Sequence, residues 1–183
     1  MTDRRLLVVH HSPSRSMRAL TDAVVAGAGD DLIEGVEVVV RPALEASAAD
    51  VLGADGILLG TPANFGYMSG ALKHFFDSTF LAIGGALGDD GTAGAGGPAG
   101  TGDSAGTRDS GGTGRAGSGA LPYGLYVHGR YDTGGAVRAV RSIVRALPWR
   151  QSAPVLDVLG DVTDEHLAGA YELGGTLAAL LTT

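Results

Sequence analysis

The sequence predicts an α/β protein, a three-layer α/β/α sandwich with a central sheet of five parallel strands in the order 2-1-3-4-5. Short apolar runs alternate along the chain with segments whose apolar residues recur at helical spacing, the pattern of a parallel sheet covered on both faces. Hydrophobic residues make up 44% of the chain, enough for one ordinary core. Five such runs joined by right-handed crossovers favour this doubly wound order.

Each predicted strand is a short run of apolar residues, often β-branched, next to Gly, Pro, Ser or charged residues. In chain order the runs cover residues 6–9, 35–40, 56–61, 121–127 and 153–158. We expect the third run to stop at Pro62, because proline has no N–H to donate within a sheet.

The predicted helices lie between these runs and after the last of them, most with apolar residues three or four positions apart. In chain order they cover residues 16–27, 47–52, 68–80, 134–147 and 163–181. Ser14 or Ser16 is expected to cap the first helix and Thr163 the last. In the last helix, four leucines are expected to face the core: Leu167, Leu173, Leu177 and Leu180.

Residues 84–119 differ in composition from the rest of the chain. They hold 15 of the 31 glycines and no aromatic residue. Such a segment cannot bury enough apolar surface to offset the entropy cost of ordering it. We therefore predict a single domain over residues 1–183 with a flexible Gly-rich surface insertion at 84–119. About 147 residues remain without it, a usual size for one domain.

Composition excludes several classes of function. The chain has no cysteine, so any redox chemistry needs a bound cofactor rather than thiols or Cys-ligated metals. A net charge of −7 with scattered basic residues disfavours nucleic acid as a partner. No apolar run approaches the length of a membrane span, and no leader is evident. We expect a cytoplasmic protein without a membrane partner.

Three loops that follow predicted strands have compositions typical of ligand sites. They cover residues 10–17, 61–66 and 128–135, after the first, third and fourth strands. In the order 2-1-3-4-5 these strands are neighbours, and ligands of such folds bind outside the carboxyl ends of strands at the switch point. We expect the three loops to meet there.

The first loop offers three serine hydroxyls, Arg15 and a helix N-terminus, which together suit a phosphate group. The alternative is a plain helix cap that uses one serine. In the second loop, Asn64 suits the polar edge of a planar ring, and Phe65 or Tyr67 would flank that ring. The alternative is that this loop is a plain turn with Phe65 packed in the core. In the third, Tyr131 suits stacking on such a ring; otherwise it is a mobile glycine turn.

The stretch Gly60–Asp77, GTPANFGYMSGALKHFFD, resembles a known family pattern. It is similar to the GTPxxxGxxxxxLKxFxD pattern after the third strand in FMN-binding members of the flavodoxin family, which includes NAD(P)H-dependent FMN reductases. The His-His-Ser-Pro-Ser run after the first strand resembles a group of small bacterial flavodoxin-like oxidoreductases. This resemblance implies a flavodoxin-like fold, FMN as a non-covalent cofactor and NAD(P)H as its reductant.

By position, the resemblance implies that the first loop binds the FMN phosphate and that the other two contact the ring. The residues implied are Ser12, Ser14, Arg15, Ser16 and Met17 for the phosphate, Pro62, Ala63, Asn64 and Phe65 for the isoalloxazine and ribityl chain, and His128, Gly129, Tyr131 and Asp132 for the ring edge. Two positions depart from the usual first loop, S-x-T-G-N-T: Arg15 replaces its glycine and Met17 its final threonine. One phosphate hydroxyl is therefore missing.

We expect an FMN-binding oxidoreductase that passes electrons from NAD(P)H through FMN to a small acceptor, with no catalytic side chain and no metal ligand assigned. Two alternatives stay open. One is an electron-carrier flavodoxin that a partner reductase reduces, with an acidic surface for a basic redox protein. The other is a flavin-free binding module of the same fold. A homodimer that buries the flavin edge is compatible with the sequence.

Three arginines, Arg138, Arg141 and Arg145, share one face of a predicted helix. They would attract the 2′-phosphate of NADPH, or they form an ordinary solvated face.

Overall fold

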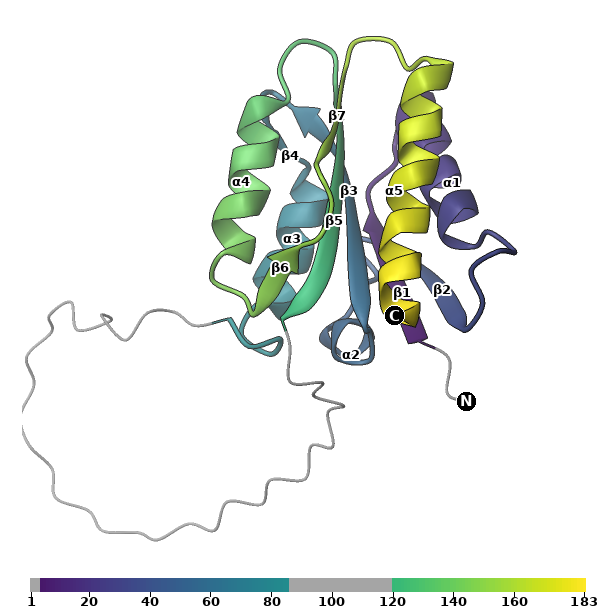
Figure 1. Cartoon of the computed structure of the whole chain (residues 1–183). Coiled ribbons are helices and arrows are strands. Elements are labelled where there is room, and N and C mark those ends of the chain that lie inside the picture. The colour runs from purple at the N-terminus through teal and green to yellow at the C-terminus, as the bar shows by residue number, and fades with distance from the viewer. Residues whose placement is uncertain (1–3, 86–119) are drawn as a thin grey trace, which may run out of the picture.

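The computed structural model describes residues 4–85 and 120–183. In this part of the chain, a sheet of seven strands lies between two layers of helices (Figure 1). The strand order is β2-β1-β3-β5-β6, with β7 paired to β5 and β4 paired to β3. The predicted α/β sandwich is confirmed.

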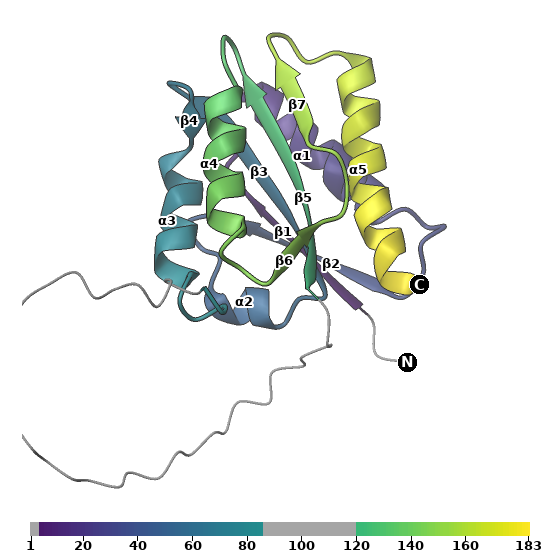
Figure 2. The same cartoon turned by 60° about the vertical axis from the view of Figure 1, so that its left-hand side comes forward.

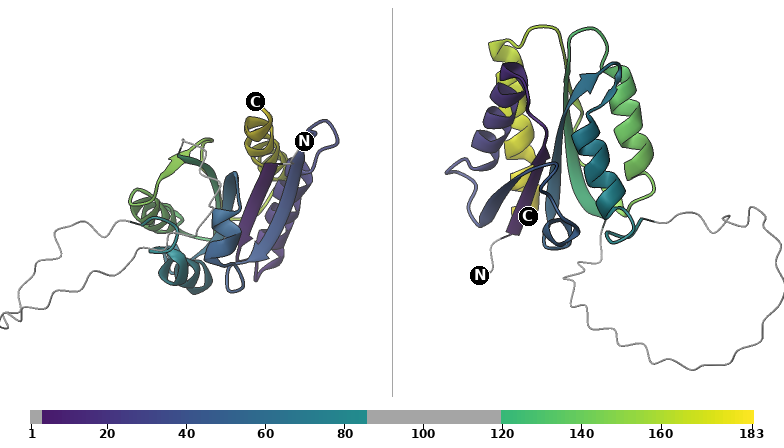
Figure 3. Two further views of the ribbon diagram at one scale, coloured as in Figure 1. Left: turned by 90° about the horizontal axis from the view of Figure 1, so that it is seen from below. Right: turned by 180° about the vertical axis from the view of Figure 1, so that it is seen from behind.

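The strands have the following bounds: β1 Arg4–His10, β2 Val36–Pro42, β3 Gly56–Asn64, β4 Tyr67–Met68, β5 Leu121–Gly129, β6 Trp149–Gln151 and β7 Leu156–Leu159. The helices are α1 Arg15–Ala28, α2 Ala48–Leu52, α3 Gly70–Thr79, α4 Gly134–Val144 and α5 Asp164–Thr182. Helices α1 and α5 cover one face of the sheet, and α3 and α4 cover the other (Figures 2 and 3).

The prediction of five strands is wrong in two places. Of the predicted strand at 153–158 only residues 156–158 lie in a strand, β7, and a separate short strand, β6, precedes it at Trp149–Gln151. Both pieces pair in parallel with β5, one at each of its ends. Pro154 lies between the two pieces and has no N–H with which to continue the pairing. In addition, the two-residue β4 pairs antiparallel with the end of β3. With β6 and β7 counted as one interrupted strand and β4 set aside, the order is the one predicted.

The prediction that β3 stops at Pro62 is also wrong, because β3 continues to Asn64. The His11 N–H donates to the Gly60 carbonyl oxygen, so the backbone groups of Gly60 face β1. By the alternation along a strand, Pro62 faces the same side, where β1 has already ended at His10. No N–H is needed at that position.

Apolar side chains from both helical layers meet the sheet in two clusters, one on each face. Met17, Leu20 and Val24 of α1 are fully buried in one of them. In α5 the N-cap Thr163 and most of the buried face match the prediction, but Leu180 is 43% exposed. The buried face of α5 runs instead through Ala170, Leu173, Leu177 and Ala178.

Two further findings concern the chain as a whole. Among the described helices, none is long and apolar enough to cross a membrane. The predicted insertion at 84–119 lies, from residue 86 on, outside the described residues.

Candidate functional site

The carboxyl ends of β1, β3 and β5 lie at one edge of the sheet, the upper edge in Figure 1. His10 is opposite Gly60 in the pairing of β1 with β3, and Pro62 is opposite His128 in the pairing of β3 with β5. The His11 N–H donates to the Gly60 oxygen at 2.9 Å. The three loops of interest therefore leave the sheet from adjacent strands.

The second and third loops lie directly against each other. A Cβ built on Gly135 would lie 1.7 Å from the Gly66 carbonyl oxygen, and one built on Gly129 would lie 3.1 Å from the Ala63 Cβ. Asp132 holds its own loop, because its Oδ1 accepts the Gly134 N–H at 2.9 Å. Only glycine leaves room for this approach of the two loops.

Two aromatic rings stand in solvent at this edge. Phe65 is fully exposed and has a positive φ of 52°, and Tyr131 is 89% exposed. The alternative that Phe65 packs in the core is therefore excluded. A left-handed backbone costs a residue with a side chain roughly 1–2 kcal/mol. Because the Phe65 side chain is fully exposed, its packing against the described residues does not offset this cost. Asn64 and Asp132 are exposed beside the two rings.

The first loop ends in a serine cap. Ser14 is the N-cap of α1, and its Oγ accepts the Met17 N–H at 3.1 Å. The Met17 side chain is fully buried in the core, so it is not available to a ligand. Arg15 is exposed and Ser16 half-buried at the start of the helix. The first N–H groups of a helix lack intrahelical acceptors, so this end of α1 suits an anion.

Ser12 takes part in a hydrogen-bonded chain that sequence reasoning missed. Its Oγ lies 2.9 Å from His10 Nδ1 and 2.8 Å from Thr21 Oγ1, which in turn lies 2.8 Å from the Tyr126 hydroxyl. Tyr126 is completely buried, and this burial raises its pKa above the usual range. Its ring occupies the space above Gly60, where a built Cβ would meet it. Nothing local in the sequence links residues 60 and 126.

A fourth loop, after β7, lies at the same edge and was also missed. His128 Nε2 is 2.8 Å from the Gly160 carbonyl oxygen, so Nε2 carries the proton, and the Gly160 N–H donates to the Gly129 oxygen. Arg130 and Asp161 form an exposed ion pair at 3.8 Å. His128 therefore fastens this loop to β5. The sequence did offer a sign of this turn, a glycine at position 160 shortly before the Thr163 cap. In the structure Gly160 has a positive φ.

Arg138 and Arg141 lie on α4 and Arg145 is its C-cap, but the three arginines do not form one group. The Arg138 Nη1 lies 3.2 Å from a Cβ built on Gly134, at the candidate edge. Arg141 and Arg145 lie instead near Tyr123, where their charges oppose the rise in the pKa of Tyr123 that burial causes. Arg138 is thus the one of the three placed near the predicted site.

Comparisons with known proteins show the family and the fold of this chain. The family described as NADPH-dependent FMN reductase matches residues 14–114, a little over half of the chain. The chain is 36% identical over 73 residues to a flavodoxin from Aquifex aeolicus, covering 40% of this chain and 38% of that protein. It is 30% identical over 95 residues to an NAD(P)H dehydrogenase (quinone) from Acidithiobacillus ferrooxidans, covering 41% and 46%.

The matched segments thus span less than half the length of either relative. Among solved structures, a flavodoxin from the domain Archaea superposes with a TM-score of 0.69 at 16% identity. That alignment covers 98% of this chain and 99% of the archaeal one. At this identity the likeness shows the fold alone, which is flavodoxin-like.

Proposed function

Because this chain belongs to the family of NADPH-dependent FMN reductases, we propose that it binds FMN non-covalently where β1, β3 and β5 end. In this proposal it passes electrons from NAD(P)H through the flavin to a small-molecule acceptor. The observation that carries the proposal is the pair of exposed aromatic rings, Phe65 and Tyr131, on two loops that touch. Flat aromatic faces held in solvent suit stacking on a flat heterocycle.

The polar groups at this edge fit the rest of the cofactor. Ser14, Arg15 and Ser16 would hold the phosphate at the N-terminus of α1, where the helix dipole and a guanidinium favour an anion. Arg15 takes the place of the glycine usual in the family and supplies the charge. Ser12 would contribute its hydroxyl from the loop before them. Among the residues implied for the phosphate, the buried Met17 side chain is the one that the fit does not use.

The remaining implied residues would orient the ring. The segment from Pro62 to Phe65 and Tyr131 would flank the isoalloxazine, with the edge of the ring toward Gly129 and Asp132. His128 would act indirectly and not as a contact of the ring, because its side chain holds the loop after β7 through the Gly160 carbonyl oxygen. FMN, when bound, supplies the hydride and electron chemistry that the side chains of this chain lack.

The test begins with a titration of the purified protein with FMN, followed by addition of NADPH or NADH to the loaded protein under argon. We expect a saturable change in flavin absorbance and then bleaching of the flavin by the nicotinamide. Free FMN at the same concentration is the control. A titration without saturation would remove the cofactor from the proposal, and a bound flavin that neither nucleotide bleaches would remove the reductase activity.

An electron carrier is the second candidate. The net charge of −7 favours docking onto a basic redox protein, and one curated relative is a flavodoxin. In that case NADPH alone leaves the flavin oxidised, and bleaching requires a partner reductase. A flavin-free binding module, the third candidate, would give no saturable titration at all.

A further inference from the structure

Four side chains form one hydrogen-bonded chain from the core to the first loop. It runs from Tyr126 on β5 to Thr21 on α1, then to Ser12 in the loop and to His10 at the end of β1. Each step measures 2.8 or 2.9 Å between heavy atoms. Tyr126 and Thr21 are buried, whereas Ser12 and His10 are half-buried. The chain thus links the interior of the protein to the loop proposed to bind phosphate.

The direction of donation along this chain follows from its buried end. Among the described residues, Thr21 Oγ1 is the one hydrogen-bond partner of the Tyr126 hydroxyl. A buried phenol proton without an acceptor is costly, so Tyr126 donates to Thr21. Thr21 then donates to Ser12, and Ser12 donates to His10 Nδ1. In this arrangement His10 is neutral and carries its proton on Nε2.

We propose that Tyr126, Thr21 and His10 are positioning residues that decide where the Ser12 hydroxyl points its proton. Neutral His10 draws that proton inward. Protonated His10 donates from Nδ1 to Ser12, which then accepts two hydrogen bonds and turns its own O–H toward the FMN phosphate. This inference rests on the proposed function, since it places the flavin phosphate at the first loop.

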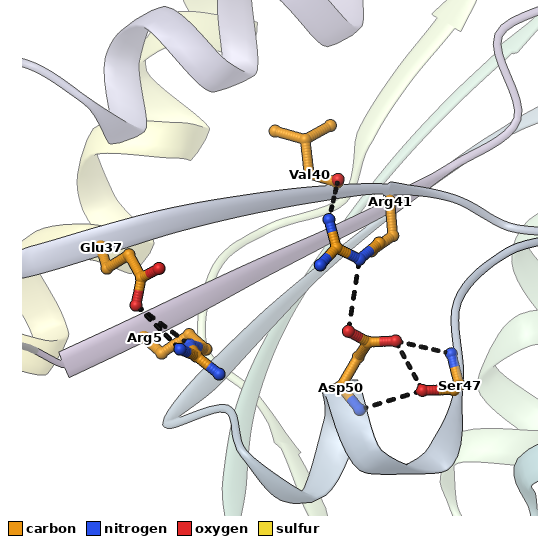
Figure 4. Close-up of polar contacts among 6 residues, drawn as sticks. All are labelled: Arg5, Glu37, Val40, Arg41, Ser47 and Asp50. Carbon is orange, nitrogen blue, oxygen red and sulfur yellow. Dashed lines mark hydrogen bonds and ion pairs between the residues drawn. The ribbon is translucent and has the colours of Figure 1, made fainter.

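The charges around His10 set the pH at which this change occurs. Burial lowers the pKa of His10 below its ordinary value of 6.5, His11 lowers it further, and Asp22 on α1 opposes them. On the neighbouring β2, the Arg41 side chain is held by Asp50 and the Val40 carbonyl (Figure 4). A bound anion favours the protonated imidazole, so by linkage the protonation of His10 strengthens FMN binding as the pH falls.

The first experiment compares FMN and riboflavin, which shares the ring and lacks the phosphate. The Kd of each ligand is measured from pH 8 to pH 5 for the wild-type chain and for His10→Asn, whose amide oxygen accepts from Ser12 but does not titrate. We expect the FMN affinity of wild type relative to the variant to rise about tenfold, the effect of one added hydrogen bond to a charged group. The phosphate of FMN titrates near pH 6 itself, but equally for both proteins.

The second experiment needs no flavin, so it separates this inference from the proposed function. Nitrogen-15 NMR of the flavin-free protein at pH 8 reports which ring nitrogen of His10 carries the proton. We expect Nε2–H alone in wild type and both tautomers in Tyr126→Phe, which keeps the ring and removes the hydroxyl. Tyr123→Phe is the matched control. The Tyr123 hydroxyl lies near Gln151 and takes no part in the hydrogen bonds that link Tyr126 to His10.

An Nδ1–H tautomer in the wild-type protein would overturn the donor direction. An equal pH effect on riboflavin and FMN would overturn the role of Ser12 toward the phosphate. If FMN does not bind but the tautomers behave as expected, the hydrogen-bonded chain stands and only the proposed cofactor fails.

Discussion

Gly60 shows how one residue on β3 makes room for the buried tyrosine of β5. A Cβ built on Gly60 would lie 2.1 Å from Tyr126 Cζ, and the ring is fully buried and cannot swing away. We expect Gly60→Ala to lower the free energy of unfolding by about 1–3 kcal/mol, the usual cost of overpacking a core. Urea denaturation measures the loss.

Gly70→Ala, in the first turn of α3, is the matched control for Gly60→Ala. A Cβ there would have nothing within 4 Å, and alanine favours a helix by up to about 1 kcal/mol over glycine. Equal stability of the two variants would show that Tyr126 does not occupy the space above Gly60.

Phe65 separates stability from function at a single position. Its positive φ disfavours a phenylalanine, whereas asparagine tolerates this conformation. We expect Phe65→Asn to stabilise the flavin-free protein by up to about 1 kcal/mol and to weaken FMN binding, because a stacking face is lost. Thermal unfolding and FMN titration measure the two effects.

Leu32→Asn provides the comparison for Phe65→Asn. Leu32 is also exposed, at 91%, but it lies in the connection between α1 and β2. This control should leave FMN affinity unchanged. Unchanged FMN affinity in Phe65→Asn would argue that the exposed ring has no part in binding.

At the scale of the elements, the N-terminus of α1 has both a structural and a proposed binding role. Ser14→Ala removes the cap on the Met17 N–H and should cost about 1 kcal/mol of stability. We also expect weaker FMN binding, since the same hydroxyl is proposed to meet the phosphate. Riboflavin binding should change less, which titration with both ligands measures.

Ser47→Ala is the matched cap variant. Ser47 caps α2 and exchanges hydrogen bonds with Asp50 (Figure 4), in the segment that leads into the start of β3, away from the candidate edge. It should lose stability but not FMN affinity. If both cap variants lost FMN affinity equally, the effect of Ser14→Ala would reflect stability alone.

Most elements could be predicted because their signals are local. Helical spacing and the caps Ser14 and Thr163 were sufficient for α1 and α5. The end of β3 was predicted wrongly because the effect of Pro62 depends on which neighbour its missing N–H would face. The strands β6 and β7 were not predicted as separate elements, because each pairs with a different part of β5, which is distant in the sequence.

At the scale of the whole molecule, residues 86–119 interrupt the chain between α3 and β5. The chain leaves and re-enters the described part at the same end of the sheet (Figure 1). From their composition, we expect replacement of 86–119 by a short Gly/Ser linker to keep the fold and FMN affinity. Circular dichroism and FMN titration test this, and loss of cooperative unfolding would contradict it.

The candidate site could be predicted only in part. The order of strands and the composition of three loops were enough to bring residues 10–17, 61–66 and 128–135 to one edge. The individual roles were less accessible. Met17 resembles a loop residue by position, yet its side chain belongs to the core. His128 resembles a ring contact, yet it holds the Gly160 turn.

The amino-acid sequence alone determined the layers, the order of the main strands and the edge where the loops meet. Periodicity, caps and breakers act within a few residues, so they can be read along the chain. Only the tertiary structure decided that Tyr126 meets Thr21, 105 positions away, and that Phe65 stands in solvent. Such contacts follow from strand register and helix packing, which bring together residues with no local relation.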